Sequence, residues 1–151
     1  MNLCLRTVEF VNVGPFADLR VELGPGAIGV FGPNGSGKTS FLRLLLAGLA
    51  GDYSLFPVTK DKVVYDGAPE DAEAYTRIGF DYGAAHYLIT RHLRKASNSL
   101  VVTTAEGSTT VRAAGEITER LRAVGVSGPA LRAAVFQEHP AWVIDATPAV
   151  R

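Results

Sequence analysis

Hydrophobic and polar residues alternate along several short segments of this 151-residue chain. Such alternation is typical of strands that turn one face toward a core and the other toward water. The alternating segments are residues 3–12, 18–23, 74–82, 85–92, 100–104 and 109–113. Turn residues separate them in pairs, at Gly14-Pro15, Gly83 and Glu106-Gly107. The pattern therefore predicts an N-terminal pair of strands, followed by two antiparallel hairpins.

Helical spacing replaces the alternation after residue 38. Residues 39–50 carry apolar side chains nearly all round, so we expect this helix to be buried, with Gly48 and Gly51 marking its end. Residues 116–124 repeat apolar side chains at the same helical spacing. A short helical turn is expected from Pro129, with Ser127 near its start. The apolar run 133–136 is expected to form a strand.

A glycine-rich stretch precedes the first helix: Gly32-Pro33-Asn34-Gly35-Ser36-Gly37-Lys38-Thr39. It matches G-x-x-x-x-G-K-[ST], the phosphate-binding P-loop. The apolar run 27–31 before it reads as a short buried strand, which completes the strand, loop and helix context of the motif. The alternative interpretation is a glycine-rich turn without a ligand. It does not explain why a strand, a glycine-rich loop, the Lys38-Thr39 pair and a helix follow one another in this order.

The chemistry of phosphate binding accounts for these residue types. A helix N-terminus offers unpaired N–H groups and a positive dipole end, and glycines let the backbone curl around an anion. Lys38 is expected to reach the β- and γ-phosphates of ATP, and the Thr39 hydroxyl to bind Mg²⁺. Gly35, Ser36 and Gly37 would hold phosphate through backbone N–H groups, and Ser40 would donate to the α-phosphate.

Composition narrows the class of protein. The formal net charge is zero, so nothing draws the whole chain toward nucleic acid or a membrane. Cys4 is the only cysteine, which excludes an internal disulfide and fits a reducing cytoplasm. No run reaches the length of a membrane span, and the N-terminus does not read as a signal peptide. We expect one soluble, cytoplasmic domain, with an irregular segment at 52–71.

A second half of the site is missing from the sequence. P-loop hydrolases also use a carboxylate at the end of a second buried strand to hold Mg²⁺. The weak candidates are Asp66, Asp81 and Asp145, and each is better explained as the end of a strand or turn. We therefore expect this chain to bind nucleotide weakly, without turning it over alone.

These motifs together resemble the ABC-type ATPase heads of SMC-like DNA repair and chromosome proteins, most closely the SbcC-type ATPase subunit of double-strand-break repair exonucleases. The strand ending in Asn12-Val13-Gly14-Pro15-Phe16 looks like that family's opening, and residues 32–40 fit its Walker A motif. Residues 75–91 look like its meander, and residues 116–136 like the stretch leading to its Q-loop. Thr147-Pro148 resembles the start of its first coiled-coil helix.

The resemblance implies a fold and further roles. Residues 1–151 would be the N-terminal lobe of an ATPase head of α/β class, with a mixed sheet around the P-loop helix and an antiparallel β meander. Gln137 would be the Q-loop glutamine, which ligates Mg²⁺ and acts in catalysis with Lys38. Asn34 would face the γ-phosphate or a partner head.

The same resemblance implies partners. A C-terminal lobe, on the same or a separate chain, would supply Walker B and the signature motif, and two heads would sandwich ATP. A nuclease subunit would complete the protein assembly. DNA is a further candidate, since Arg91, Arg94, Lys95 and Arg112 lie in a basic part of the chain, although a charged sheet edge explains them equally well.

Other functions remain open at this level. The chain also fits the ATPase subunit of an ABC transporter, a nucleotide-binding interaction module without hydrolysis, or a RecF- or RecN-like recombination protein. The Gly14-Pro15-Phe16 turn and the position of Thr147 favour the SMC-like class.

Overall fold

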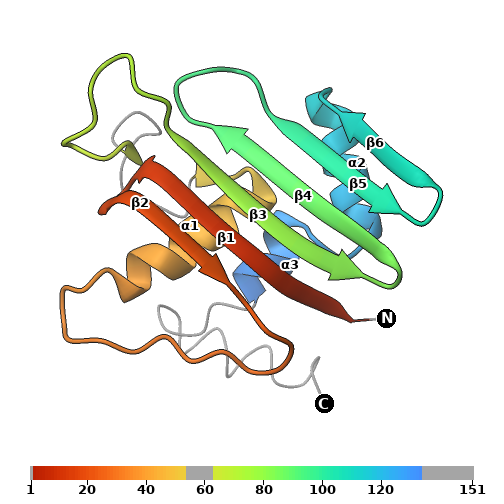
Figure 1. The fold of residues 1–151 in the computed structure, drawn as a ribbon, viewed down its shortest axis with the longest axis horizontal. Coiled ribbons are helices and arrows are strands. Elements are labelled where there is room, and N and C mark those ends of the chain that lie inside the picture. The colour runs from red at the N-terminus through yellow and green to blue at the C-terminus, as the bar shows by residue number, and fades with distance from the viewer. Residues whose placement is uncertain (1, 54–62, 134–151) are drawn as a thin grey trace.

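A six-stranded antiparallel sheet forms the body of the protein (Figure 1), in the order β2-β1-β3-β4-β5-β6. The computed structural model describes residues 2–53 and 63–133. The strands are β1 (Leu3–Val13), β2 (Phe16–Glu22), β3 (Tyr75–Tyr82), β4 (Ala85–His92), β5 (Ser99–Thr104) and β6 (Gly107–Val111). The alternating segments of the sequence correspond to these strands, so the predicted meander is confirmed.

Three helices in the described residues lie together behind the sheet as it is drawn in Figure 1. They are α1 (Lys38–Ala50), α2 (Ala114–Ala123) and α3 (Gly128–Ala133). All three were predicted, and α1 ends at Gly51, which adopts a left-handed conformation with φ of 71°. Ser127 begins α3 as expected, because the Ala130 N–H donates to its Oγ at 3.3 Å. The predicted strand 133–136 falls mostly outside the described residues.

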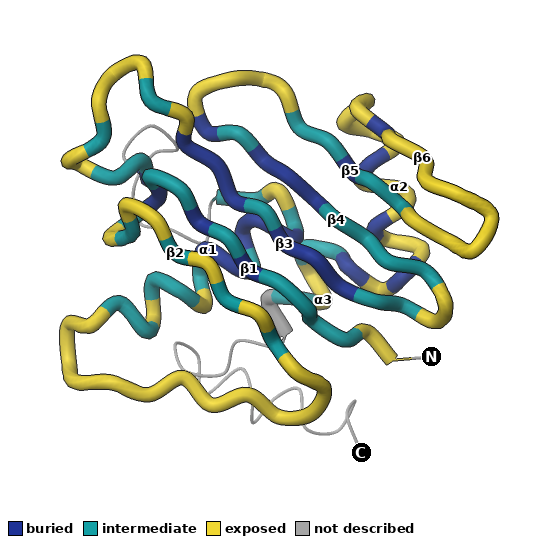
Figure 2. Tube along the Cα trace, in the orientation of Figure 1, coloured by how far each residue is buried: buried dark blue, intermediate teal, exposed yellow. Residues whose placement is uncertain are grey.

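The core lies between the sheet and the helices, and β3 and β4 run through its middle (Figure 2). Val8, Ile78, Ile89 and Leu100 stand opposite one another across β1, β3, β4 and β5, and each is at most 1% exposed. Leu44 of α1 packs into the same cluster. One face of the sheet therefore buries apolar side chains of β1, β3, β4 and β5, whereas β2 has no buried residue.

The other face carries ion pairs that cross between strands. The Arg77 guanidinium lies 3.4 Å from Glu9, and Arg6 donates to Asp81 at 2.6 Å. The His86 ring nitrogen lies 2.7 Å from the same Asp81 carboxylate. His86 and Arg6 hold the pKa of Asp81 below its usual value by hydrogen bonding to the ionised carboxylate. Much of the charge on this face is thus paired within the sheet.

Two predictions about the sheet are wrong. Residues 27–31 form no strand, and Ile28, Val30 and Phe31 are exposed, Phe31 by 92%. The described sheet is purely antiparallel rather than mixed. A strand needs a neighbour to satisfy its backbone hydrogen bonds, and within the described residues no strand lies beside residues 27–31.

Close packing joins α1 to β3 at Gly48. A Cβ at this position would lie 2.7 Å from Ile78 Cδ1 and 2.9 Å from Thr76 Oγ1. Gly48, which the sequence suggested as a helix end, is therefore a buried contact inside the helix. Only the absent side chain lets the helix approach the sheet this closely.

Replacing Gly48 with valine should destabilise the protein by about 1–3 kcal/mol, because the added atoms overfill a packed contact. The free energy of unfolding, measured by urea denaturation, tests this. In an Ile78→Ala background, the same Gly48→Val substitution should cost less than it does in the parent protein, because the truncation vacates the space that the Cδ1 atom fills. Equal stability of Gly48→Val and the parent protein would contradict the packing described.

Candidate phosphate-binding site

The loop from residue 32 to residue 37 leads directly into α1. Gly35 and Gly37 adopt positive φ angles of 80° and 90°, which suit residues without a Cβ. The Ser36 N–H donates to the Pro33 carbonyl at 3.2 Å, so the loop turns tightly. Gly37 is the residue before the helix and has no side-chain cap. The backbone thus curls into a ring at the mouth of the helix.

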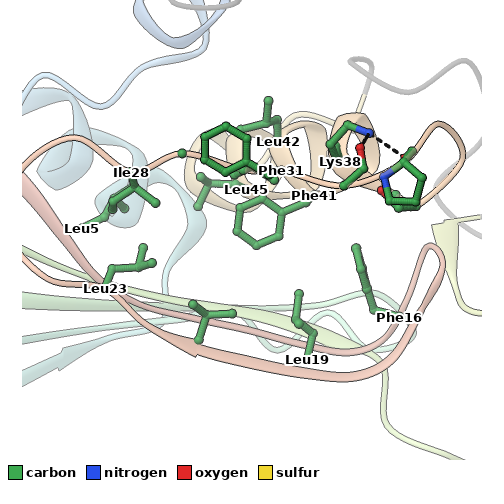
Figure 3. A pocket seen from close by; sticks show the side chains of 17 residues that line it. Leu5, Phe16, Leu19, Leu23, Ile28, Phe31, Lys38, Phe41, Leu42 and Leu45 are labelled. Carbon is green, nitrogen blue, oxygen red and sulfur yellow. Dashed lines mark hydrogen bonds between the residues drawn. The ribbon is translucent and has the colours of Figure 1, made fainter.

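Lys38 closes this ring. Its Nζ donates to the carbonyl oxygens of Gly32 at 2.6 Å and Pro33 at 2.7 Å, as the dashed lines in Figure 3 show. An ammonium group has three N–H donors, so one remains for a ligand. The lysine therefore holds the two ends of the loop together and places a positive charge at its centre.

The electrostatics of the loop favour an anion. The first N–H groups of a helix have no partner within it, and they sit at the positive end of the dipole. The first turn of α1 contains no acidic residue, and Thr39 is exposed. Backbone N–H groups, the Lys38 ammonium and the Thr39 hydroxyl thus belong to one short stretch at the start of α1, which fits a phosphate chain.

The turn between β1 and β2 supports the loop from below. A Cβ at Gly37 would lie 3.3 Å from Pro15 Cγ and 3.4 Å from Phe16 Cζ. Gly14, with φ of 55°, lies against Leu44 of α1. The two sequence motifs that carried the family resemblance, one at residues 12–16 and one at residues 32–40, are therefore in contact.

The structure brings together the sequence-predicted phosphate ligands from Asn34 to Ser40. Gln137 lies outside the described residues, as does Thr147. The residues 2–53 and 63–133 contain no group of three His, Cys, Asp or Glu side chains able to hold a metal ion. Among the predicted Mg²⁺ ligands, only Thr39 is therefore placed.

An apolar groove that sequence reasoning missed opens beside the loop. Its volume is about 610 Å³, and it lies between the inner face of β1 and β2 on one side and α1 with residues 28–33 on the other (Figure 3). Leu19 and Leu23 point into it from the sheet side, and Phe31 and Leu42 line the opposite wall. The signal was in the sequence, because residues 27–31 are apolar yet have no partner strand among the predicted elements.

Most of the basic residues proposed for DNA contact form hydrogen bonds or ion pairs within this chain. Arg91 is only 7% exposed, so its inclusion in a surface patch is wrong. Arg94 donates to the carbonyls of Glu70 and Ala72, and Lys95 pairs with Glu73 at 3.0 Å. Arg94, Lys95 and Arg112 are exposed on the surface.

An antiparallel sheet, a packed helix and a phosphate-binding ring at that helix's N-terminus define an α/β nucleotide-binding domain. Comparison with known families agrees: the chain belongs to the AAA domain family, whose model matches residues 7–136. Domains of this type are P-loop ATPases and are found in SMC-like proteins. No helix in the described part of the chain is long and apolar enough to cross a membrane.

Proposed function

We propose that this chain is the N-terminal lobe of an SMC-like ABC-type ATPase head, most similar to the SbcC type of DNA double-strand-break repair. The observation that carries the proposal is a glycine-rich loop, closed by Lys38 at the start of α1, that lies beside an apolar groove in the described residues. Phe31 is 92% exposed, and no described strand pairs with residues 27–31. Both observations support a further segment that covers this part of the proposed head.

The residues of the ring have separate roles in this proposal. Backbone N–H groups of Gly35, Ser36 and Gly37 bind the β-phosphate region of ATP, and the Lys38 ammonium neutralises the β- and γ-phosphates. Thr39 binds Mg²⁺ through its hydroxyl, and Ser40 donates to the α-phosphate. Bound Mg²⁺ would offset phosphate charge, while the chain's own contribution is to position the triphosphate.

The groove is the proposed seat of the C-terminal lobe. A strand from that lobe would pair with residues 27–31 and cover the apolar walls, which include Leu19 and Leu42. That lobe would also bring the Mg²⁺-binding carboxylate, for which this chain offers only weak candidates, so hydrolysis would require both lobes. We further propose a second head and a nuclease subunit as partners, and DNA as the substrate of the assembled machine rather than of this lobe alone.

Co-expression with a C-terminal lobe tests the function. The two polypeptides should co-elute on gel filtration, and ATP hydrolysis should rise far above that of this chain alone. Separate elution, together with an unchanged hydrolysis rate, would contradict the two-lobe proposal. Binding of Mg·ATP by this chain alone, measured by calorimetry, tests the phosphate site independently.

Gln137→Ala should spare nucleotide binding and lower the hydrolysis rate of the assembled head by about 10-fold or more, since its proposed role is in the reaction and head pairing. The measurement is kcat at saturating ATP, beside the Kd for Mg·ATP. A neighbouring change, Glu138→Ala, serves as the matched control and should leave both values near those of the parent protein. An unchanged kcat for Gln137→Ala would remove this glutamine from the mechanism.

A further inference from the structure

Arg91 is buried, with 7% of its surface exposed, and it is the one buried charged side chain among residues 2–53 and 63–131. It lies on the core face of β4, directly across from Thr76 of β3. Burying a guanidinium costs several kcal/mol unless hydrogen bonds or an opposite charge compensate it. Burial lowers the pKa of Arg91, because it disfavours the charged guanidinium, so hydrogen bonds to that group matter for its stability.

The carbonyl end of α1 supplies that compensation. Arg91 Nε donates to the Gly48 carbonyl at 2.7 Å, and Nη2 donates to the Leu49 carbonyl at 3.2 Å. A Cβ at Gly51, the residue that ends the helix, would lie 2.7 Å from Arg91 Cζ. The guanidinium thus lies against the negative end of the helix dipole and satisfies carbonyls that the helix leaves without partners.

The helix α1 is held unevenly along its length. Its C-terminal half is buried, with Leu44, Leu45, Ala47, Gly48 and Leu49 in the core. Its first turns are exposed or half-buried and border the open groove, and Leu42 is 42% exposed. A helix of this length spans about 20 Å. The placement of the phosphate-binding ring at one end therefore depends strongly on how the other end is anchored.

We propose that Arg91 is a positioning residue for nucleotide binding. Its hydrogen bonds to the carbonyl end of α1 fix the position of this helix, and thereby the position of the phosphate-binding ring at the opposite end. This rests on the proposed function, because it assumes that the ring binds the phosphates of ATP. Arg91 itself lies outside the ring and touches none of its residues through the hydrogen bonds described.

Two variants of the full chain separate the contribution of the Arg91 charge from that of its two hydrogen bonds. Arg91→Met keeps the long side chain and removes both hydrogen bonds and the charge. Arg91→Lys keeps the charge and loses the two-pronged geometry. The matched control is Leu100→Ala, a substitution of a buried residue that should also destabilise the protein, by about 2–5 kcal/mol. Leu100 lies on β5, whereas β3 and β4 are the strands that pack most against α1.

The probe is Mg·ATP, titrated by calorimetry at a temperature where each variant is folded. We expect Arg91→Met to weaken binding about 10-fold or more, Arg91→Lys to fall between it and the parent, and Leu100→Ala to stay within about twofold of the parent. An equal loss in Leu100→Ala, or parent affinity in Arg91→Met, would overturn the positioning role. If Arg91→Met does not fold, the comparison of Arg91→Lys with Leu100→Ala decides in the same way.

Amide hydrogen exchange gives a readout that needs no nucleotide. Amides of residues 42–46, in the middle of α1, should exchange faster in Arg91→Met and Arg91→Lys than in Leu100→Ala at equal overall stability. Equal exchange in all variants would overturn the anchoring argument. A parent protein that binds no Mg·ATP would instead reject the proposed function, while the exchange result would still decide whether Arg91 anchors the helix.

Discussion

Replacing Lys38 with alanine should abolish measurable binding of Mg·ATP, a loss of about 100-fold or more in affinity. One cause is direct, because a charge-assisted hydrogen bond to phosphate contributes about 1.5–3 kcal/mol. The second cause is structural, because the Lys38 ammonium also joins the carbonyls of Gly32 and Pro33 and so closes the ring. Both contributions disappear in the same substitution.

Calorimetric titration with Mg·ATP measures this loss, and circular dichroism checks that the fold survives. Survival is expected because Lys38 lies at the exposed end of α1, away from the buried core. Lys95→Ala is the matched control: it removes the same type of side chain from an exposed pair with Glu73, distant in sequence from the loop. Parent affinity in Lys38→Ala would reject the phosphate site altogether.

Replacing Phe31 with serine should weaken assembly with a C-terminal lobe by about 10- to 100-fold. Phe31 is 92% exposed in this chain and lines the groove, so its burial would contribute only on assembly. Full burial of a phenylalanine side chain stabilises a complex by about 1.5–3 kcal/mol, which sets the size of the effect. The stability of the isolated chain should stay unchanged, because the side chain packs little within it.

Leu3→Ser is the control for the Phe31 variant, since Leu3 is also an exposed apolar residue, at 37%, and does not line the groove. Analytical ultracentrifugation of each variant mixed with the C-terminal lobe gives the two dissociation constants. The groove assignment requires Phe31→Ser to weaken assembly and Leu3→Ser to leave it near the parent value. Equal effects of both substitutions would show that the groove is not the seat of that lobe.

Local sequence rules were sufficient for most elements. Alternation placed β1 to β6 within a few residues, because successive side chains of a strand point to opposite faces and most of these strands turn apolar residues toward the core. Glycine chemistry placed the turn after Val13 and the end of α1 at Gly51, since positive φ angles favour residues without a Cβ. The order of residues in the P-loop motif likewise predicted a ring followed at once by a helix.

Long-range contacts explain where the sequence reasoning failed. The run 27–31 is as apolar as a buried strand, yet burial depends on a neighbour that the described residues do not supply. Arg91 belongs to a basic stretch of sequence, yet strand register turns it inward to meet the carbonyl end of α1. Local spacing alone shows neither which strand will lie beside a segment nor a hydrogen-bond partner 43 residues away.

The sequence by itself determined the strands, the helices and the chemistry of the phosphate ring, because these follow from periodicity and from the conformational freedom of a few glycines. Only the tertiary structure decided that the β1–β2 turn supports the ring and that Arg91 is buried beneath α1. It alone showed that an apolar groove of about 610 Å³ lies beside the ring in the described part of the chain. The physical reason is that contacts between distant segments, unlike local spacing, depend on how the sheet stacks its strands.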